Sequence, residues 1–309
     1  MSSFIPAFRG AFLYLSRQAG LRRFMETSAV AQRLTSRFVA GIRLDDAIRV
    51  ASRLREQQVQ SSLDYLGENV SSLEEAGRSR DAFLAALDQI AADQLPATVS
   101  MKVTSLGLDL SEESCLELTD RVCARAQAIG SRVEFDMEDS SYTDRNLRIV
   151  KEMHSRYGAV RAVIQAYLFR SEQDVRDLCA LRVPVRLCKG AYREPSQMAW
   201  QDKADVDANF IKLMRILFEQ GTQPAIATHD EEMINRAITS AKSTDTSHED
   251  FEFQMLYGVR PKLQRRVAQQ GFRLRLYVPY GEAWYPYFMR RIAERPANAL
   301  FVAKSLISG

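Results

Sequence analysis

The sequence has little histidine, and its cysteines have no spacing that indicates a metal site or a disulfide framework. Its 309 residues include three histidines and four cysteines. No histidines form an H-x-H or H-x-x-H pair, which argues against a zinc enzyme. Cys115, Cys123, Cys179 and Cys188 have no paired spacing. We therefore expect no metal site and reduced, buried thiols in a cytoplasmic protein.

Long apolar runs and a strong net charge are also missing. No apolar run reaches the roughly 20 residues that cross a membrane. The net charge is only +3, and no zinc-finger or RNA-binding signature occurs, so we expect no nucleic-acid partner. There is no G-x-G-x-x-G turn and no G-x-x-x-x-G-K-[ST] loop. What remains, with 46% hydrophobic and 26% charged residues, is typical of a globular protein.

The N-terminal part is basic and reads as helical. Residues 1–44 contain seven arginines and a single acid, Glu26. Such a segment fits helices that pack on a domain, or a basic arm that rests on anionic lipid, and the sequence favours packing. Apolar residues at helical spacing over 47–58 extend the pattern. We predict an N-terminal helical arm over 1–58, followed by a catalytic domain over 59–309.

The remainder alternates between short apolar runs and amphipathic segments of helix length. The predicted strands are 61–66, 99–103, 132–135, 160–164, 183–187, 224–227, 251–255 and 273–278. Eight strands that alternate with helices predict an α/β fold, a (β/α)8 or TIM barrel. A doubly wound open sheet is the alternative, and the missing G-x-G-x-x-G turn argues against it. Ser71 and Glu74 have the spacing of a capping box at the start of one helix.

Polar residues recur at or near the carboxyl ends of the predicted strands. They are Glu68, Lys102, Asp136, Gln165, Arg186, Thr228 with His229, Gln254 and Tyr277. In a parallel barrel these ends meet on one face, which is where barrel enzymes build their active sites. We therefore expect the functional site on this face.

The segment 281–298, GEAWYPYFMRRIAERPAN, is predicted to form a helix directly after the last strand. Arg290 and Arg291 are adjacent, and Tyr287 lies three and four residues before them, so its ring sits beside both. Two guanidinium groups can hold a small carboxylate in bidentate geometry. The alternative is a solvated Arg/Glu face with core aromatics. A helix in this place can fold over the barrel mouth and bring both arginines to the site.

The strand-end motifs resemble those of the proline dehydrogenases, and the stand-alone bacterial enzymes in particular. The motifs are SLDYLGE, MKVTSLGL, EFDME, VIQAYL, VRLCKGAYREP, ATHD, EFQMLYGVR, YVPYG and YFMRRIAERPAN. The resemblance implies a distorted barrel with the last helix over the mouth and an extra N-terminal helix outside. It also implies non-covalent FAD and oxidation of L-proline to Δ1-pyrroline-5-carboxylate, the first step of proline degradation. Electrons would pass to a membrane quinone.

The resemblance also assigns roles to residues. Arg290, Arg291 and Lys102 would bind the substrate carboxylate, with Asp136 and Glu294 holding Arg291. The wall around the proline ring would be Tyr192, Leu256, Tyr277 and Tyr287. The flavin would contact Met137, Gln165, Arg186, Lys189, Gly190, Ala191, Tyr192, Thr228, His229, Gln254, Arg291 and Glu294. Asp230 stands where some relatives have asparagine, which puts an acid close to cofactor phosphate.

Three rival functions remain open at this point. A metal-dependent hydrolase would use Asp136, His229, Asp230 and Glu68, against which the scarcity of histidine counts. A barrel that only binds an amino acid is the second. The third is a flavoenzyme for another substrate, such as hydroxyproline or a folate. For the favoured reading we expect a cytoplasmic protein with peripheral contact at the inner membrane face. The sequence specifies no oligomeric state.

Overall fold

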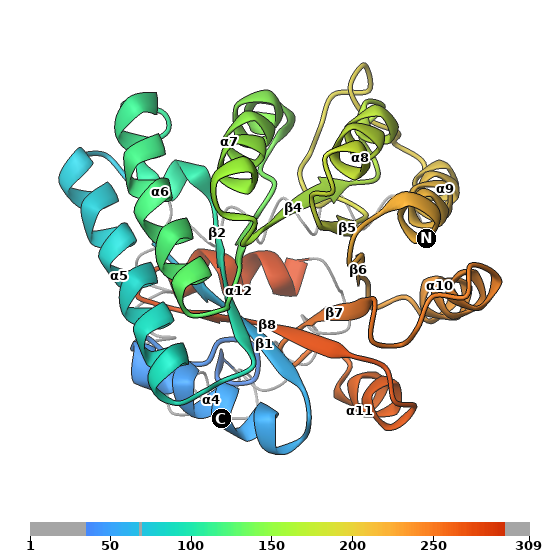
Figure 1. Cartoon of the computed structure of the whole chain (residues 1–309), viewed down its shortest axis with the longest axis horizontal. Helices are drawn as coiled ribbons and strands as arrows, with labels where there is room; N and C mark the ends of the chain where they lie inside the picture. Colours follow the sequence, from blue (N-terminus) through green and yellow to red (C-terminus); the bar gives the residue numbers. More distant parts are fainter. Residues whose placement is uncertain (1–34, 68–69, 294–309) are drawn as a thin grey trace.

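The fold is a closed barrel of eight parallel strands, β1 to β8 in chain order (Figure 1). The computed structural model describes residues 35–67 and 70–293, with side chains described up to residue 289. The strands are β1 Gln60–Tyr65, β2 Ala97–Met101, β3 Val133–Phe135, β4 Val160–Gln165, β5 Val185–Cys188, β6 Ala225–Ala227, β7 Glu252–Leu256 and β8 Leu274–Tyr280. Each predicted strand overlaps an observed one, and the predicted barrel is confirmed.

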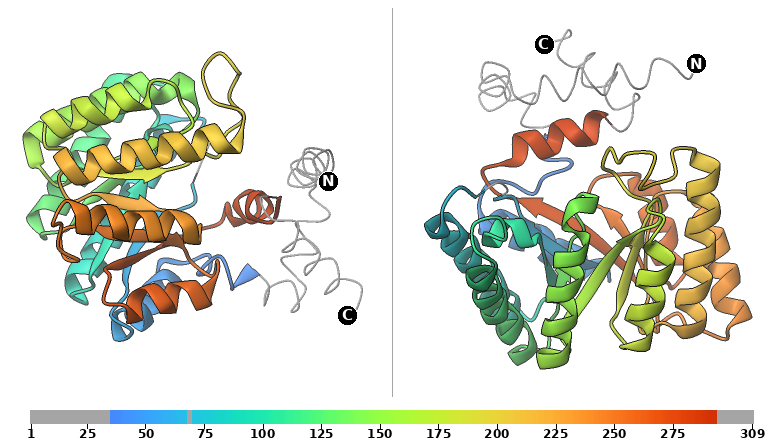
Figure 2. Two further views of the ribbon diagram at one scale, coloured as in Figure 1. Left: turned by 90° about the vertical axis from the view of Figure 1, so that its right-hand side faces the viewer. Right: turned by 90° about the horizontal axis from the view of Figure 1, so that it is seen from above.

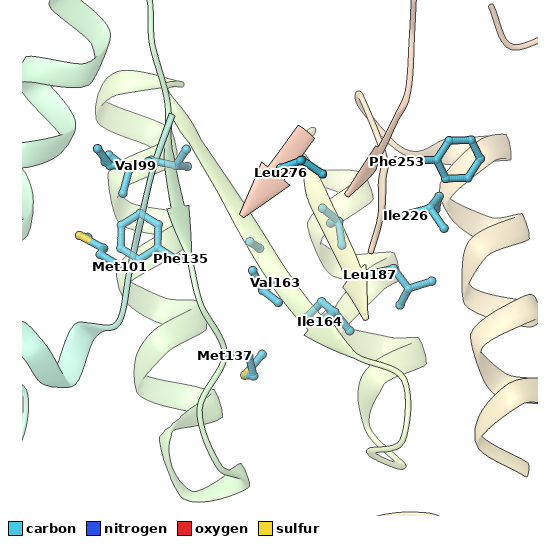
Figure 3. Close-up of a cluster of buried hydrophobic side chains, with 14 of the residues drawn as sticks. Val99, Met101, Phe135, Met137, Val163, Ile164, Leu187, Ile226, Phe253 and Leu276 are labelled. Atoms are coloured by element: carbon cyan, nitrogen blue, oxygen red, sulfur yellow. The ribbon is translucent and has the colours of Figure 1, made fainter. Parts of the chain in front are cut away.

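Helices surround the barrel and bury its outward-facing side chains. They are α5 Leu73–Ala92, α6 Glu112–Ala128, α7 Thr143–Tyr157, α8 Ser171–Ala180, α9 Lys203–Gln220, α10 Glu231–Ser243 and α11 Pro261–Gln269, with short 3-10 helices η1 Val103–Leu106 and η2 Ser140–Tyr142. Alternate strand residues such as Val99, Phe135, Leu187 and Phe253 form the core between strands and helices (Figure 3). Because side chains alternate along a strand, the residues between them point into the barrel.

Two helices depart from the regular pattern. The helix after β8, α12 (Trp284–Ala293), lies across one end of the barrel, as Figure 2 shows. Its residues Trp284, Tyr285 and Phe288 pack with Phe38 and with Leu66, which directly follows β1. Since all strands are parallel, this is their carboxyl end. The outer place beside β8 and β1 is filled by α4 (Leu44–Glu56), as expected of an N-terminal helix.

The predicted capping box is wrong by one residue. The N-cap of α5 is Ser72, whose side chain accepts a hydrogen bond from the Glu75 amide at 3.2 Å. The Glu75 carboxylate accepts from the Ser71 amide at 2.6 Å. The run SSLEE contains two Ser/Glu pairs with the same spacing, so spacing alone does not choose between Ser71 with Glu74 and Ser72 with Glu75.

The basic segment over 1–34 lies outside the described residues, so the division into an arm over 1–58 and a barrel over 59–309 stays a prediction. Within the described part of the chain, no helix is long and apolar enough to cross a membrane. The same residues contain no group of three or more histidine, cysteine or acidic side chains that could hold a metal ion. The four cysteines are free thiols.

Candidate functional site

The barrel brings most of the predicted site residues to the end that α12 covers. Gln165 and Leu256 are the last residues of β4 and β7, Arg186 and Gln254 lie two residues before the ends of β5 and β7, and Tyr277 lies three residues before the end of β8. Lys102, Asp136, Met137, Thr228 and His229 follow directly after β2, β3 and β6. The placement follows from the parallel strands alone. The roles of these residues stay predictions.

Asp136, Arg186 and Tyr277 form a connected group although Arg186 lies in β5, Tyr277 in β8 and Asp136 directly after β3. Arg186 Nη1 donates to Asp136 Oδ1 at 2.5 Å, and the Tyr277 hydroxyl donates to Asp136 Oδ2 at 2.7 Å. The Arg186 guanidinium carbon lies 5.6 Å from the centre of the Tyr277 ring. Burial, and next the charge of Asp136, raise the pKa of Tyr277 well above its usual value. The hydroxyl is therefore a stable donor at neutral pH.

Arg186 is held by a second carboxylate, that of Glu134, which the sequence interpretation did not include. Arg186 Nη2 donates to Glu134 Oε2, and Ser100 accepts from Nη1 at 3.3 Å. Burial lowers the pKa of Arg186, but Glu134 and Asp136 raise it by more, so the guanidinium stays charged. Two carboxylates thus fix one cation, with Asp136 on its mouth side.

Glu134 belongs to a buried ionic network in the barrel interior. Its other members are Arg161, Glu252, Gln254 and Arg275 from β4, β7 and β8. The missed signal was an alternating pattern: a charged residue stands two positions before a site residue in β3, β7 and β8. In those strands the pairs are Glu134 and Asp136, Glu252 and Gln254, and Arg275 and Tyr277. Residues two apart on a strand face the same side.

Gln165 ties the loop after β5 to the loop after β3. Its Nε2 donates to the Glu138 carbonyl at 2.7 Å, and its Oε1 accepts from the Ala191 amide at 3.4 Å. Gly190 has φ +111°, and a Cβ there would run into the ring of Tyr167. Only glycine suits this position, because it adopts positive φ and lets the loop lie against the ring.

Lys189 pairs with two carboxylates at the mouth. Its Nζ lies 2.9 Å from Asp230 Oδ2 and also contacts Asp207. Asp230 is the N-cap of α10, where its side chain accepts from the Glu232 amide at 3.1 Å. Burial raises the pKa of Asp230, but Lys189, with smaller contributions from the Glu232 amide and Lys203, lowers it below its usual value. The acid that seemed out of place beside a cofactor therefore caps a helix and balances Lys189.

His229 links the ends of β6 and β7. Its Nε2 accepts a hydrogen bond from the Leu256 amide at 2.9 Å, and its carbonyl accepts from Arg260 Nη1 at 2.7 Å. A ring nitrogen that accepts from an amide carries no proton, so this imidazole is neutral. Through this bond His229 positions the backbone of Leu256.

The remaining predicted residues are described only in part. Lys102 is half-buried, Tyr192 is 38% exposed on the rim, and Tyr287 is buried among the residues of α12. Arg290 and Arg291 lie in the last turn of α12, but their side chains are outside the described residues. Glu294 and Glu68 are outside them altogether.

The described residues fit a bound flavin in two respects. Arg186 Nε is buried and has no hydrogen-bond partner within the described chain, so one donor of this cation lacks an acceptor. A buried donor without an acceptor is rare unless a ligand completes it. Its aromatic neighbour Tyr277 adds a flat ring beside this cation, of the kind that a flavin can lie against.

Comparison with known proteins gives consistent matches. The family model described as "Proline dehydrogenase" matches residues 47–304. The protein is 40% identical over 300 residues to Proline dehydrogenase 1 of Bacillus subtilis (strain 168), covering 97% of this chain and 99% of that one. It is 38% identical over 281 residues to Proline dehydrogenase of Deinococcus radiodurans, with 89% and 91% covered.

One solved structure extends the likeness to three dimensions. It is the crystal structure of proline utilization A (PutA) from Bdellovibrio bacteriovorus inactivated by N-propargylglycine. The TM-score is 0.82 at 25% identity, and the match covers 93% of this chain. The chain spans about a third of that longer protein, 36% of its length.

Proposed function

The chain belongs to the proline dehydrogenase family, and we propose that it oxidises L-proline to Δ1-pyrroline-5-carboxylate with FAD bound at the carboxyl end of the barrel. Proline oxidation is the first step of proline degradation. The observation that carries the flavin site is the Arg186 guanidinium, which Asp136 and Glu134 hold and whose Nε lacks an acceptor in the described structure. The family is flavin-dependent, which supports FAD.

FAD, when bound, supplies the acceptor for the hydride that leaves the substrate. The protein's part is to hold groups in place before the reaction. Arg186 presents a fixed positive charge, which favours an anionic reduced ring. Lys189, balanced by Asp230 and Asp207, is our candidate for a phosphate contact. Gln165 and Gly190 shape the loop between them.

Proline would be held by its carboxylate and enclosed by rings. Arg290, Arg291 and Lys102 form the proposed cationic clamp. Asp136 accepts one described bond on each oxygen, from Arg186 and Tyr277, and a carboxylate oxygen can accept a second. It therefore keeps capacity for Arg291. An apolar wall would enclose the substrate ring, because the carbons of that ring, from which hydride leaves, are apolar. The residues of this wall would be Leu256, Tyr277, Tyr192 and Tyr287.

The substrate nitrogen must be neutral before hydride leaves, because its lone pair forms the C=N bond of the cationic product as the C–H bond breaks. His229 is not a base for this proton, since its Nε2 already accepts from the Leu256 amide. Positioning of a neutral amine then accounts for much of the rate. We therefore expect activity to rise with pH as the proline amine loses its proton.

The decisive experiment is an absorption spectrum recorded without oxygen before and after addition of L-proline. The purified protein should be yellow, and L-proline should bleach the flavin band. A colourless protein would overturn the flavin site, and a yellow protein that L-proline does not bleach would overturn the substrate. Addition of hydroxyproline to a second sample tests the alternative substrate, which the family comparisons do not favour.

The clamp is tested by Arg290→Ala and Arg291→Ala. Each variant should raise KM for proline strongly while FAD stays bound, and Arg290→Lys should also lose affinity because a point charge cannot replace a planar fork. Arg121→Ala is a control, since Arg121 pairs with Glu117 on the exposed face of α6. Unchanged proline kinetics in both alanine variants would refute the clamp.

For the electron acceptor we propose a membrane quinone, met by a cytoplasmic protein at the inner membrane face. A soluble quinone analogue should reoxidise the proline-reduced enzyme faster than oxygen does. Sedimentation with anionic vesicles tests the membrane contact, and it should weaken as salt screens the basic N-terminal segment.

A further inference from the structure

We infer that Glu134 is a positioning residue for proline oxidation: its carboxylate fixes the Arg186 guanidinium and sets the charge that the bound flavin meets. The inference rests on the proposed flavin site and deepens it. Glu134 lies in β3, two residues before Asp136, and its side chain points into the barrel. It was not among the residues that the sequence indicated.

Glu134 is fully buried, with 0% of its surface exposed, and both of its oxygens are used. Oε2 accepts from Arg186 Nη2 and, at 3.1 Å, from Gln254 Nε2. Oε1 accepts from Thr98 at 3.1 Å and from Arg161 Nη1 at 3.2 Å. The carboxylate is thus held from several sides, so it gives Arg186 a fixed anchor.

The carboxylate is charged in the folded protein. Burial alone raises the pKa of Glu134, but Arg186, Arg161 and Arg275 together lower it to about 2. Buried ion pairs are weak contributors to stability, because desolvation offsets their attraction, and apolar replacements are often as stable. Stability alone therefore does not account for a network of charges inside a barrel. Orientation of Arg186, the cation of this network that bonds Asp136 at the mouth, does.

That cation is Arg186, and each of its three guanidinium nitrogens has a different environment. Nη1 serves Asp136, Nη2 serves Glu134, and Nε is left without a described acceptor. Without Glu134 the guanidinium loses one of its two carboxylates and the constraint on its rotation. Its positive charge is also less compensated by nearby carboxylates. Both the orientation and the charge of Arg186 next to the bound flavin would therefore change.

The chain offers a matched control in Glu252. This residue is equally deep, 2% exposed, and belongs to the same network. It accepts from Arg161 Nη1 at 2.5 Å, Arg275 Nε at 2.9 Å and Gln254 Nε2 at 2.6 Å, and none of its described contacts is with Arg186. Glu252→Gln therefore removes the same charge from the same network without touching the Arg186 contact.

The test compares the reduction potential of the bound flavin in wild type, Glu134→Gln and Glu252→Gln, measured against a reference dye. Glutamine keeps an oxygen for Arg186 but loses the negative charge, so the reduced anionic flavin should be favoured about tenfold more. For a two-electron couple this is a shift of about +30 mV. Glu252→Gln should shift the potential by less than a third of that. Equal shifts in both variants, or none in Glu134→Gln, would overturn the inference.

A second variant separates orientation from charge and serves if Glu134→Gln does not fold. Glu134→Asp keeps the charge but shortens the reach to Arg186 by one methylene. Its kcat should fall about tenfold, with KM for proline changed less than twofold, because the clamp is intact. Unchanged kcat in Glu134→Asp would contradict the positioning role. Failure of L-proline to bleach the wild-type flavin would instead refute the proposed function.

Discussion

Replacement of Tyr277 by phenylalanine removes one oxygen from the connected group at the barrel mouth. The lost group is the donor to Asp136 Oδ2 at 2.7 Å, while the ring that lies 5.6 Å from the Arg186 guanidinium carbon is kept. Asp136 would keep its bond from Arg186 but lose a donor on its second oxygen. The perturbation is therefore confined to one hydrogen bond.

The size of the effect follows from the kind of bond. Hydrogen bonds to charged groups contribute about 1.5–3 kcal/mol each, and a buried carboxylate that loses its donor is disfavoured by a similar amount. If that energy holds Asp136 in its reactive geometry, kcat/KM for proline should fall between about tenfold and about 100-fold, at about 1.4 kcal/mol per factor of ten. FAD should remain bound.

The assay is steady-state proline oxidation with an artificial dye acceptor, with the flavin spectrum as a check on loading. Tyr280→Phe is the matched control on the same strand, because the buried Tyr280 hydroxyl has no hydrogen-bond partner among the residues described. That variant should change kcat/KM less than twofold. Equal losses in the two variants would show that the Tyr277–Asp136 bond does not act on the reaction.

Two further predictions concern stability. The pKa of Glu134 is lowered to about 2 in the folded protein. Its carboxylate therefore stabilises the fold at any pH above the usual pKa of a glutamate, and this contribution is lost as the pH falls toward 2. Between pH 5 and pH 3, the free energy of unfolding measured in urea should thus fall by about 2 kcal/mol less in Glu134→Gln than in wild type. Gly258→Ala should lower Tm, since Gly258 has φ +73° and a Cβ there would run into the Arg37 carbonyl. Gly77→Ala should raise Tm slightly, because a Cβ at Gly77 on α5 meets no other atom and alanine favours a helix more than glycine does.

The barrel and its site face could be predicted because the evidence for them is local. Each strand is a short run of mostly buried residues, and a polar residue such as Lys102, Asp136 or Gln165 stands at or near the end of each predicted strand. Parallel strands then bring those residues together without any further information. The position of α12 needed the resemblance as well, since a helix after the last strand can equally pack outside the barrel.

The interior network could not be predicted, because its partners are distant in sequence. Arg186 and Glu134 are 52 residues apart, and Gln254 and Glu134 are 120 apart. A single arginine in a strand such as VRAVIQ is read as a solvent-facing residue, since charges are rarely buried without partners. Only closure of the barrel shows that Arg161 faces Glu134 and Glu252.

The acidic partners of Lys189 and Arg186 are also distant in sequence, so the sequence indicated the two cations but not what holds them. Each is paired with two carboxylates: Lys189 with Asp207 and Asp230, and Arg186 with Glu134 and Asp136. In both cases the carboxylates hold the cation in a fixed place. What distinguishes Arg186 from Lys189 is its Nε, a buried donor that has no hydrogen-bond partner among the described residues. If flavin chemistry depends on that donor, the acidic residues that orient the guanidinium matter as much as the cation, and Glu134 becomes part of the reaction's machinery although it lies beneath the mouth.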